Sequence, residues 1–571
     1  MTTEAGSWTG PVAPRKRWQV REVDETAALG LRDSMGLFAT TARVLVARGL
    51  SVQSAAEEFL APGLDALHSP FCFAAMETAV ERLLRAVRDQ ERVAIHGDYD
   101  VDGISGSVLL ATVLKHLGGD VEVILPHRVL DGYGLEPAGI DRAAELGATV
   151  VVAVDCGITA IEACERAAEH GMDVIIADHH LPQDQLPHAL AILNPRLEGS
   201  GYPEQDLAAV AVAFKLACGV LERSGSTASG LSMLKLVALG TIADLVPLRG
   251  ENRALAIHGL RALAGAVNPG LQELMKVSKV DPRRVTAGDV GFRLAPRINA
   301  AGRVGHPDDA AQMFMTEDRA VARELAGRLE RLNTERRELE QATAAAAIEA
   351  HADDEGSVIV AAGEGWHRGV IGIVASRLVE TTGRPALVVA IEGEDAYGSA
   401  RSVPAFDVTA ALSSASACLE AFGGHKQAAG FRLKASRIDA LREAVNEHAS
   451  QFGSDSLKAV LTCDDVLHPD DATKELALEL ERLAPFGIGN PRPRFLCEGV
   501  RLAGPPQILK DAHLKLQVRS ADSTIPALAW RRADLGEALV GHDTVDFVAT
   551  LRTNRFRGRL EPQFEIDDLR V

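Results

Sequence analysis

The sequence of 571 residues contains no apolar run of about 20 residues, the length that a membrane-spanning helix requires. It contains seven cysteines, and none of them stands in a C-x-x-C pair. We therefore expect reduced thiols rather than a disulfide framework or a zinc ribbon. The N-terminal stretch MTTEAGSWTGPVAPRKRW carries basic residues but lacks the apolar segment of a secretory signal. These absences predict a cytoplasmic protein that does not associate with a membrane.

The sequence also has no excess of basic residues. Its 79 acidic residues outnumber its 60 lysines and arginines, so the formal net charge is −19. Proteins that bind nucleic acid usually show a basic surface, so this charge weighs against such a partner, although only weakly. A carboxylate-rich site becomes positive when it holds metal ions, and an acidic protein can carry a local basic groove. The length predicts three or four domains of a globular protein.

Two segments alternate between short apolar runs and amphipathic helical stretches. In residues 91–265 the runs RVAI, VEVILP, TVVVAV and DVIIA are rich in Val and Ile, as in parallel strands that are buried on both faces. Helices are expected between them at about 104–117 and 160–169. A second block of this kind, which begins with SVIVAAG, is predicted for residues 353–452. The fold class is therefore α/β, with two α/β domains.

The remaining segments connect and flank these two domains. Residues 1–90 have helical apolar spacing and predict an N-terminal helical capping region. Residues 266–352 form a connector, in which the charged and Ala-rich stretch 308–352 predicts one long helix that joins the α/β domains. Short strand-like runs with little helix over residues 456–571 predict a C-terminal OB-like β-barrel.

Polar side chains follow three predicted strands of the first α/β domain, and a further acid lies in an apolar helical stretch. They are His96, Asp98, Asp100, Asp102, Asp155, Asp178, His179, His180 and Asp244. Ligand sites in parallel sheets lie beyond the carboxyl ends of the strands, so these residues should converge in space. The three acids at 98–102 alternate and would share one side of an extended segment, where they repel unless a cation lies between them. Carboxylates and imidazoles without thiolates favour Mn²⁺ or Mg²⁺ over structural zinc.

Each of these residues also has a simpler explanation. Asp155 follows a strand and could cap a helix N-terminus. The adjacent residues His179 and His180 could be a coincidence or polar groups of the core. Asp244 could form an ion pair with a nearby arginine. It is their combination at neighbouring strand ends that favours a site for divalent metal ions.

These motifs resemble the DHH phosphoesterase superfamily, whose name comes from the triad at 178–180. Its H-x-x-x-D-x-D motif matches residues 96–102, and its later acids match Asp155 and Asp244. The resemblance implies two divalent metal ions, Mn²⁺ or Mg²⁺. The implied ligands of the first ion are His96, Asp100 and Asp155. Those of the second ion are Asp102, Asp155, His179 and Asp244, so that Asp155 bridges the two ions.

The resemblance further implies that Asp155, His179 and His180 are the catalytic residues. His180 would assist at the phosphate or orient the metal ligands. Asp98 and Asp178 would have supporting roles or serve as alternate ligands.

The second α/β domain carries GGHKQAAGF at 423–431, which resembles the signature of the DHHA1 domain. With the stretches RINAAGR, GWHRGVIGIVASRL and GSARS that precede it, it resembles the RecJ family of bacterial exonucleases over nearly the whole chain. The implied contacts to the 5′-phosphate and the backbone of the substrate are Arg303, Ser399, Arg401, Gly424 and His425. Arg297 and His367 are implied as weaker contacts. Taken alone, the glycines would indicate an ordinary turn and Arg401 a surface charge.

Membership of this family implies 5′→3′ hydrolysis of single-stranded DNA to 5′-mononucleotides in DNA recombination and repair. The single-stranded-DNA-binding protein and a RecQ-type helicase are implied as partners, although no interaction motif is evident. A narrow passage between the two α/β domains would exclude duplex DNA. In the OB-like region, Phe495, Trp530 and Phe556 are candidates for base stacking or for the barrel core.

Two rival hypotheses remain open. One is a DHH enzyme that acts on short oligonucleotides or cyclic dinucleotides, although such enzymes generally lack an OB-like appendage. The other is a non-catalytic relative that serves as a replication scaffold. Loss of metal ligands would mark that class, and here the ligands are complete.

Overall fold

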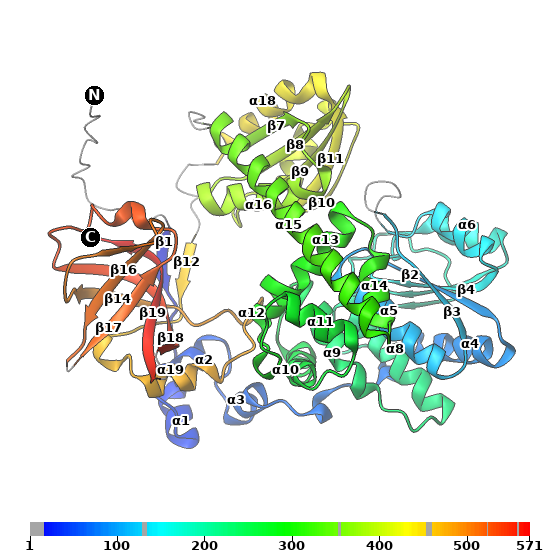
Figure 1. Ribbon diagram of the computed structural model, residues 1–571, viewed down its shortest axis with the longest axis horizontal. Helices are drawn as coiled ribbons and strands as arrows, with labels where there is room; N and C mark the ends of the chain where they lie inside the picture. Colours follow the sequence, from blue (N-terminus) through cyan, green and yellow to red (C-terminus); the bar gives the residue numbers. More distant parts are fainter. Residues whose placement is uncertain (1–15, 128–133, 352–355, 453–459, 522, 557–558) are drawn as a thin grey trace. The chain divides into compact units, whose positions relative to one another are not determined.

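The computed structural model describes residues 16–127, 134–351, 356–452, 460–521, 523–556 and 559–571, with the side chains of residues 555 and 556 left aside. The chain forms two compact units (Figure 1). One comprises Gly63–Gly453 and Pro485–Asn490, and the other Met1–Pro62, Ser454–Ala484 and Pro491–Val571. Across the described ranges, no helix is both long and apolar enough to span a bilayer.

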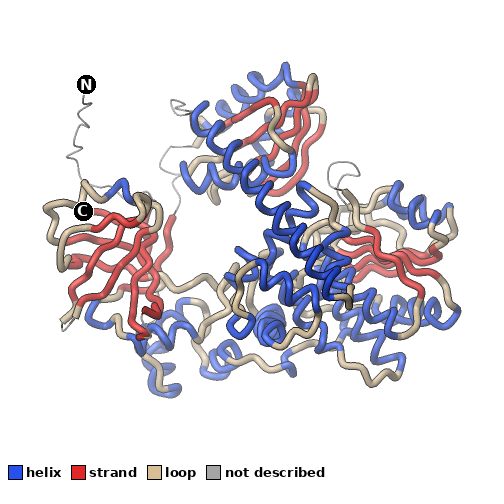
Figure 2. The backbone as a smooth tube through the Cα atoms, in the orientation of Figure 1, coloured by secondary structure: helices blue, strands red, loops and turns tan. Residues whose placement is uncertain are grey.

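The first α/β domain is built on a parallel sheet with the strand order β3-β2-β4-β5-β6. Figure 2 shows the strands of this sheet, in red, between blue helices. Its strands are β2 (Arg92–Gly97), β3 (Asp120–Ile124), β4 (Ala148–Val154), β5 (Asp173–Ala177) and β6 (Ala191–Leu193). The central strands are buried almost throughout, which explains their unbroken Val and Ile runs. The structure thus confirms the predicted α/β class.

Helices cover both faces of this sheet, because alternate residues of each strand point to opposite sides. Val150 and Val152 pack into a core with α4 (Met76–Asp89), α5 (Val101–His116), α8 (Ala209–Ser224) and α9 (Leu234–Ala243). Val151 and Ala153 pack on the other side with α6 (Pro137–Glu145) and α7 (Ile161–Glu169). Helix α5 begins three residues earlier than the sequence predicts.

The connector is helical, but the predicted single helix at 308–352 is wrong. The structure has two helices there, α14 (Asp308–Met315) and α15 (Arg319–Ala350). Asp318 separates them, because its carboxylate accepts hydrogen bonds from the backbone amides of Ala320 (2.6 Å) and Val321 (3.3 Å) and so starts a new helix. Before them come α10 (Gly250–Ala264), α11 (Pro269–Val277), α12 (Ala287–Asp289), a π-helical turn (Val290–Leu294) and α13 (Ala295–Val304).

The second α/β domain has a mixed sheet with the order β10-β11-β9-β8-β7. Its elements are β7 (Ile359–Glu364), α16 (Arg368–Thr382), β8 (Ala386–Glu392), β9 (Asp395–Arg401), α17 (Val408–Ser414), β10 (Ala421–His425), β11 (Ala428–Lys434) and α18 (Ile438–Ala449). Strands β7 and β8 are parallel, whereas β8, β9, β11 and β10 pair antiparallel. Helix α16 and the end of α15 share a core with β7 and β8.

The other unit contains a curved sheet with the order β13-β14-β18-β19-β17-β16-β15. Its strands are β13 (Asp465–Val466), β14 (Phe495–Arg501), β15 (Gln507–Leu509), β16 (His513–Arg519), β17 (Thr524–Ala529), β18 (Thr544–Phe556) and β19 (Arg559–Arg570). Leu502, just after β14, pairs with Val518 of β16, so the sheet closes on itself. Phe495 is buried in this barrel, whereas Trp530 is half exposed beside the His513 ring. The side chain of Phe556 lies outside the described residues.

The stretch 1–90, which the sequence treats as one region, is divided between the two units, and residues 1–15 lie outside the described residues. Strand β1 (Arg17–Val20) pairs with β12 (Val460–Cys463) in the barrel unit, where Trp18 Nε1 donates to the buried Asp568 at 2.9 Å. The same unit contains α1 (Glu25–Met35), α2 (Ala39–Ala47), α3 (Gln53–Leu60) and α19 (Lys474–Glu481). Helix α4, in contrast, covers the first α/β sheet.

A buried ionic network ties the segment before α4 to helices α8 and α10. The ammonium of Lys215 contacts the carboxylate of Glu251 and donates to the carbonyl of His68 at 2.7 Å. The hydroxyl of Tyr202 donates to the other carboxylate oxygen of Glu251 at 2.6 Å. Since Lys215 and Glu251 are both almost fully buried, each charge depends on the other for compensation.

We predict that Lys215→Met lowers the free energy of unfolding by about 3–5 kcal/mol, because it leaves the Glu251 charge buried without its cation. Urea denaturation followed by circular dichroism measures this change. The double variant Lys215→Met/Glu251→Gln should lose clearly less stability than the single variant. Equal losses in the two variants would contradict a compensated buried pair.

Candidate metal centre and substrate cleft

The acid-rich segment after β2 is a strand-to-helix turn, so the prediction that its three acids share one extended side is wrong. Asp100 is the N-cap of α5, where its Oδ1 accepts from the amides of Asp102 (2.8 Å) and Gly103 (3.3 Å). Asp102 lies within the helix and accepts from the amides of Ala209 (2.8 Å) and Val210 (2.9 Å) at the start of α8. The capping preference of aspartate therefore turns alternate acids in different directions.

Glycines make this tight turn possible. A Cβ at Gly103 would lie 2.5 Å from the backbone nitrogen of Asp98, and one at Gly97 would lie 2.9 Å from the carbonyl oxygen of Gly103. On the opposite side, a Cβ at Gly240 would lie 2.6 Å from Asp102 Oδ1. Only glycine at these three positions lets the backbone segments and the Asp102 carboxylate approach one another this closely.

Asp155 follows β4 in a left-handed conformation with φ of 63°, which is uncommon for a residue other than glycine. It does not cap a helix, because the N-cap of α7 is Ala160. Its buried Oδ1 accepts no hydrogen bond from any described residue and lies 3.3 Å from His179 Nε2. Burial, followed by the nearby charges of Asp102 and Asp100, raises the pKa of Asp155 well above its usual range.

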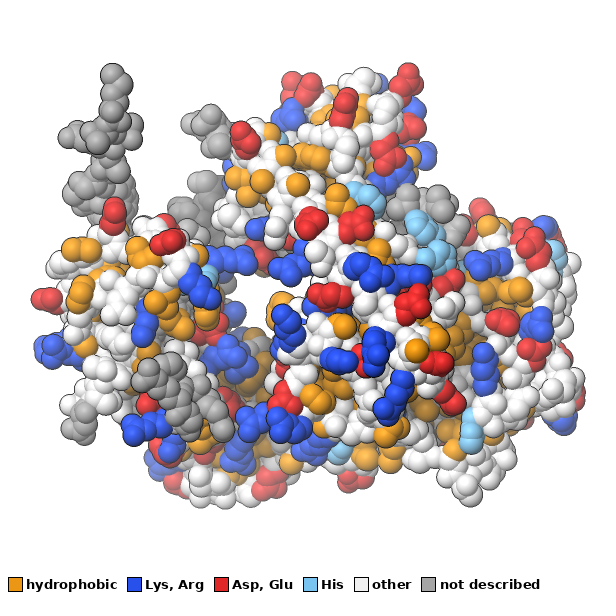
Figure 3. All heavy atoms as spheres, in the orientation of Figure 1, with side chains coloured by type: hydrophobic (Ala, Val, Ile, Leu, Met, Phe, Trp, Pro, Cys, Tyr) orange, Lys and Arg blue, Asp and Glu red, His pale blue; other side chains and the backbone are white. Residues whose placement is uncertain are grey.

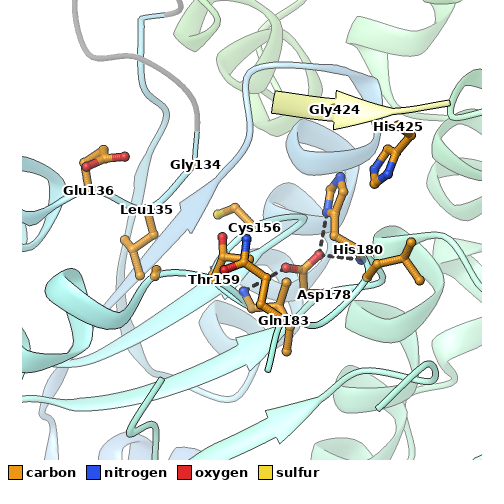
Figure 4. A pocket seen from close by; sticks show the side chains of 14 residues that line it. Gly134, Leu135, Glu136, Cys156, Thr159, Asp178, His180, Gln183, Gly424 and His425 are labelled. Atoms are coloured by element: carbon orange, nitrogen blue, oxygen red, sulfur yellow. Dashed lines mark hydrogen bonds and ion pairs between the residues drawn. The ribbon is translucent and has the colours of Figure 1, made fainter. Parts of the chain in front are cut away.

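Asp178 fixes the position of the two histidines that follow it. Its carboxylate accepts from the backbone amides of Ile158 (3.0 Å), His179 (2.7 Å) and His180 (3.1 Å), and His180 Nδ1 lies 2.7 Å away (Figure 4). Burial alone would raise its pKa, but the hydrogen bond and charge of His180 hold the pKa of Asp178 at about 2. Asp178 is therefore an ionised residue that orients His180, as its predicted supporting role requires.

His179 lies between two carboxylates. Its Nε2 is 3.3 Å from Asp155 Oδ1 and 3.5 Å from Asp244 Oδ2. Burial lowers the pKa of His179 to about 3, so its imidazole is neutral and offers a lone pair. Burial and the Asp102 charge raise the pKa of Asp244 to about 9. Among the described residues, the side chain in close contact with the Asp244 carboxylate is this neutral histidine, and no arginine forms a salt bridge with it.

The donor atoms form three overlapping groups, in each of which they lie within 4.8 Å of one another. These groups are Asp155-His179-His180, Asp102-His179-Asp244 and Asp98-Asp100-Asp155. The second matches most of the predicted ligand set of the second ion. The third contains Asp98 where the first predicted set has His96, and no group found among the described residues includes His96. The Nε2 of His96 instead lies 3.2 Å from the carbonyl oxygen of Gly134.

This donor set fits divalent cations. Several buried carboxylates cannot all be ionised at such distances without a positive charge, and Asp155 Oδ1 still lacks a hydrogen-bond donor. Oxygen donors with neutral imidazoles and no thiolate suit Mn²⁺ and Mg²⁺. Since Asp155 and His179 each belong to two groups, the arrangement can hold two neighbouring ions that share ligands.

A cleft of about 350 Å³ lies next to this cluster, and both α/β domains line it. Asp178 and His180 contribute from the first domain, and Gly424 and His425 of β10 from the second (Figure 4). Figure 3 shows histidine side chains gathered where the second domain faces the first. The sequence did not single out several lining residues, because no motif marks them: Gly134, Leu135, Glu136, Thr159 and Gln183.

The sheet of the second domain places the other predicted substrate residues on the face that bears His425. Pairing aligns His425 with Ala428 and Ala428 with Arg401, and it aligns Gly430 with Ser399 in the next row of the same face. Arg401 Nη1 donates to Ser399 Oγ at 3.1 Å. Gly424 has φ of 145°, and a Cβ there would lie 2.4 Å from the carbonyl oxygen of Ala428, so this turn requires glycine.

Positive groups gather at the N-terminus of α16. A Cβ at Gly372 would lie 3.0 Å from Ser399 Oγ, so this helix lies directly over the Ser399 and Arg401 side chains. Arg303 Nη1 donates to the carbonyl of Gly369 at 3.2 Å, and His367 is the N-cap of the helix. Two guanidinium groups beside a helix N-terminus form an environment suited to an anion.

Arg297 does not join this group. Its guanidinium pairs with Glu330 of α15 and donates to the carbonyl of Arg293 at 2.6 Å. His367 Nδ1 accepts from the amide of Gly369 at 3.0 Å, which is a capping interaction. Both residues therefore have structural partners within the protein, and their contact with substrate stays a prediction.

Comparison with known proteins relates all three domains to one family. The model of the DHH family N-terminal domain matches residues 92–241, that of the DHHA1 domain residues 355–451, and that of the RecJ OB domain residues 463–568. The single-stranded-DNA-specific exonuclease RecJ of Bacillus subtilis is 36% identical over 98% of this chain and 71% of its own. RecJ of Escherichia coli is 33% identical over 96% of this chain and 98% of its own.

Solved structures agree with these sequence relatives. The crystal structure of RecJ from Thermus thermophilus in complex with Mn²⁺ superimposes with a TM-score of 0.85 and 32% identity, covering 98% of this chain and 80% of that one. The Mg²⁺ complex of the same protein gives a TM-score of 0.79 with 30% identity over 98% and 79% of the two chains.

We predict that the metal-free protein loses stability as the pH rises from about 4 to 9. Burial raises the pKa of Asp102 to about 7 and that of Asp244 to about 9, above the ordinary value of about 4. In this window the unfolded chain ionises these groups before the folded chain does, so ionisation favours unfolding. Urea denaturation in EDTA should show a loss of roughly 6 kcal/mol between pH 5.5 and 8.5, with about 2 kcal/mol from Asp102 and about 4 kcal/mol from Asp244.

Mg²⁺ at about 100 times its Kd should add about 2.7 kcal/mol and reduce this pH dependence, because it binds the ionised carboxylates. The matched variant Asp244→Asn should be less sensitive to pH in EDTA. Identical pH profiles in EDTA and in Mg²⁺ would contradict a cation site at these acids.

Proposed function

The chain belongs to the RecJ family of single-stranded-DNA-specific exonucleases, and we propose that it removes 5′-mononucleotides one at a time from the 5′ end. The observation that carries this proposal is the position of two sites on one cleft. Asp178 and His180, beside the acidic cluster, line the cleft from the first domain, and His425 lines it from a sheet face that also carries Arg401 and Ser399. A phosphate chain that enters such a cleft meets a cation site and an anion-binding site in succession.

The residues that would hold the two ions are Asp100, Asp102, Asp155, His179 and Asp244, together with Asp98 or His96. Bound Mn²⁺ or Mg²⁺ would supply Lewis-acid catalysis, charge neutralisation on the phosphate and a lower pKa for water. The contact with the carbonyl of Gly134 would orient the His96 ring at the end of β2.

The protein's own groups would orient the scissile phosphate. Asp178 holds the His180 ring through Nδ1, and His425 faces the same cleft from the second domain (Figure 4). These two imidazoles would hydrogen-bond to phosphate oxygens from opposite sides, where donors fixed in advance stabilise the charge that develops during hydrolysis.

Arg303, Ser399 and Arg401 would bind the terminal 5′-phosphate at the N-terminus of α16. This site would determine polarity, because only a 5′ end presents a terminal phosphate in that orientation. Its fixed separation from the acidic cluster would determine the product length. Duplex DNA would be excluded by a narrow passage between the two α/β domains.

Further parts of the proposal rest on the family resemblance. They are a role in DNA recombination and repair, a cytoplasmic location, and binding to the single-stranded-DNA-binding protein and a RecQ-type helicase. The OB-like barrel would hold the strand that follows the scissile phosphate, with the half-exposed Trp530 as a stacking surface.

We expect Asp155→Ala to lower Mn²⁺-dependent release of mononucleotides from a 5′-labelled single strand by at least about 10³-fold, since Asp155 belongs to two donor groups. Asp439→Asn, at an exposed carboxylate outside the cluster, serves as the control and should retain full activity. The substrates are a dinucleotide and strands of increasing length. Persistent hydrolysis in Asp155→Ala would refute the site, and activity restricted to dinucleotides would indicate a short-oligonucleotide enzyme.

We expect Arg401→Met to remove the preference for a 5′-phosphate over a 5′-hydroxyl end. The loss of a charge-assisted hydrogen bond of about 1.5–3 kcal/mol corresponds to a decrease of roughly 10- to 100-fold in kcat/KM on the phosphorylated strand. Activity on the hydroxyl strand should change little. Arg437→Met removes an exposed guanidinium of the same domain and is the matched control. An equal decrease on both strands would argue against a 5′-phosphate site.

A further inference from the structure

Helix α13 contacts both the turn that carries the metal-binding acids and the anion site. At the turn, Asn299 Oδ1 accepts a hydrogen bond from the backbone amide of Val101 at 3.0 Å. Val101 is the first residue of α5, directly between Asp100 and Asp102. A side chain from the connector therefore binds the backbone between two of the candidate ligands.

This hydrogen bond completes the N-terminus of α5. The side chain of Asp100 accepts from the amides of Asp102 and Gly103, and its carbonyl accepts from Ile104 at 2.9 Å. Val101 is the remaining amide of the first turn, and Asn299 is its acceptor. The orientation of the acid-rich turn thus depends on one residue that lies nearly 200 positions later in the chain.

Two contacts hold α13 firmly in this position. A Cβ at Gly302 would lie 2.5 Å from the carbonyl oxygen of Tyr99, so the helix backbone packs directly on the turn. At the other side, a Cβ at Gly369 would lie 2.3 Å from the carbonyl oxygen of Arg303, so the end of α13 packs equally closely on the start of α16. Asn299 and Arg303 are four residues apart, which is about 6 Å along the helix axis.

We propose that Asn299 is a positioning residue, which fixes the acid-rich turn relative to the 5′-phosphate site so that cleavage falls one nucleotide from the end. This inference rests on the proposed function of Arg303 and deepens it. Because the hydrogen bond and the anion contact come from one turn of one helix, the turn and the anion site move together. A shift of about 1 Å at such a site can reduce the rate about 100-fold.

The test uses the full chain with Asn299→Ala, which removes the acceptor, and Asn299→Asp, which keeps an oxygen in its place. Asn268→Leu is the matched control, because Asn268 is also an asparagine that caps a helix, with Oδ1 2.9 Å from the amide of Leu271 in α11. The measurements are kcat and KM, the length of the released products, the 5′-phosphate preference, the melting temperature and the Kd for Mn²⁺ alone.

Asn299→Ala should lower kcat about 10- to 100-fold with little change in KM, weaken Mn²⁺ binding and release dinucleotides beside mononucleotides. Asn299→Asp should restore mononucleotides as the main product. Asn268→Leu should lower the melting temperature without any of these changes. Products of one nucleotide and unchanged kcat and Mn²⁺ affinity in Asn299→Ala would overturn the inference.

The Mn²⁺ measurement separates this inference from the proposed function. If the unmodified protein binds Mn²⁺ but does not cleave single strands, the proposed function fails. If that happens, weaker Mn²⁺ binding by Asn299→Ala than by the unmodified protein would still support the positioning role. Equal Mn²⁺ binding by the two proteins would overturn it.

Discussion

Electrostatic repulsion among buried carboxylates is the constraint on which the active region of this molecule depends. Asp98, Asp102 and Asp155 are all buried at the carboxyl edge of one parallel sheet, and burial, followed by the charges of the neighbouring acids, raises the pKa of Asp155. A chain that only had to fold would not place them there, because buried uncompensated charge is among the most costly features of a protein interior. The surrounding structure supplies part of the compensation through backbone amides, as at the start of α8. Divalent cations would supply the rest.

The parallel sheet makes this concentration of charge possible. Because β2, β4 and β5 run in the same direction, the residues that follow them meet at one edge although they lie more than 80 positions apart. The sheet of the second domain then adds His425 to the same cleft, and Arg401 lies on the same face of that sheet. Metal ions held by the acidic residues would face the phosphodiester, and the basic residues would face the terminal phosphate. The two groups together are complementary to a nucleic acid strand with a terminal phosphate. This local arrangement explains how a chain with a net charge of −19 can act on DNA.

The sequence predicted the features that depend on local composition or on a fixed spacing. Buried strands follow from unbroken Val and Ile runs, and the convergence of Asp155 and His179 follows from the order of parallel strands. Features that depend on one side chain that accepts hydrogen bonds from backbone amides could not be predicted in this way. Asp318 divides a helix that periodicity treats as continuous, and Asp100 begins a helix where alternation suggests an extended segment. His96 fits the superfamily motif and lies beside Gly134, whereas the proximity of Asp98 to Asp155 could not be read from that motif.

Contacts between distant segments set a second limit on prediction from sequence. Asn299 and Gly302 lie in the stretch RINAAGR, where arginines attract attention because they are charged. In the structure the neutral members of that stretch contact the acid-rich turn, whereas Arg297 pairs with Glu330. Gly302 has no side chain, and its role is to let two backbones approach more closely than any side chain would allow. A site that must hold charges in fixed positions needs a rigid support, and here close helix packing through glycine supplies that support without adding further charge.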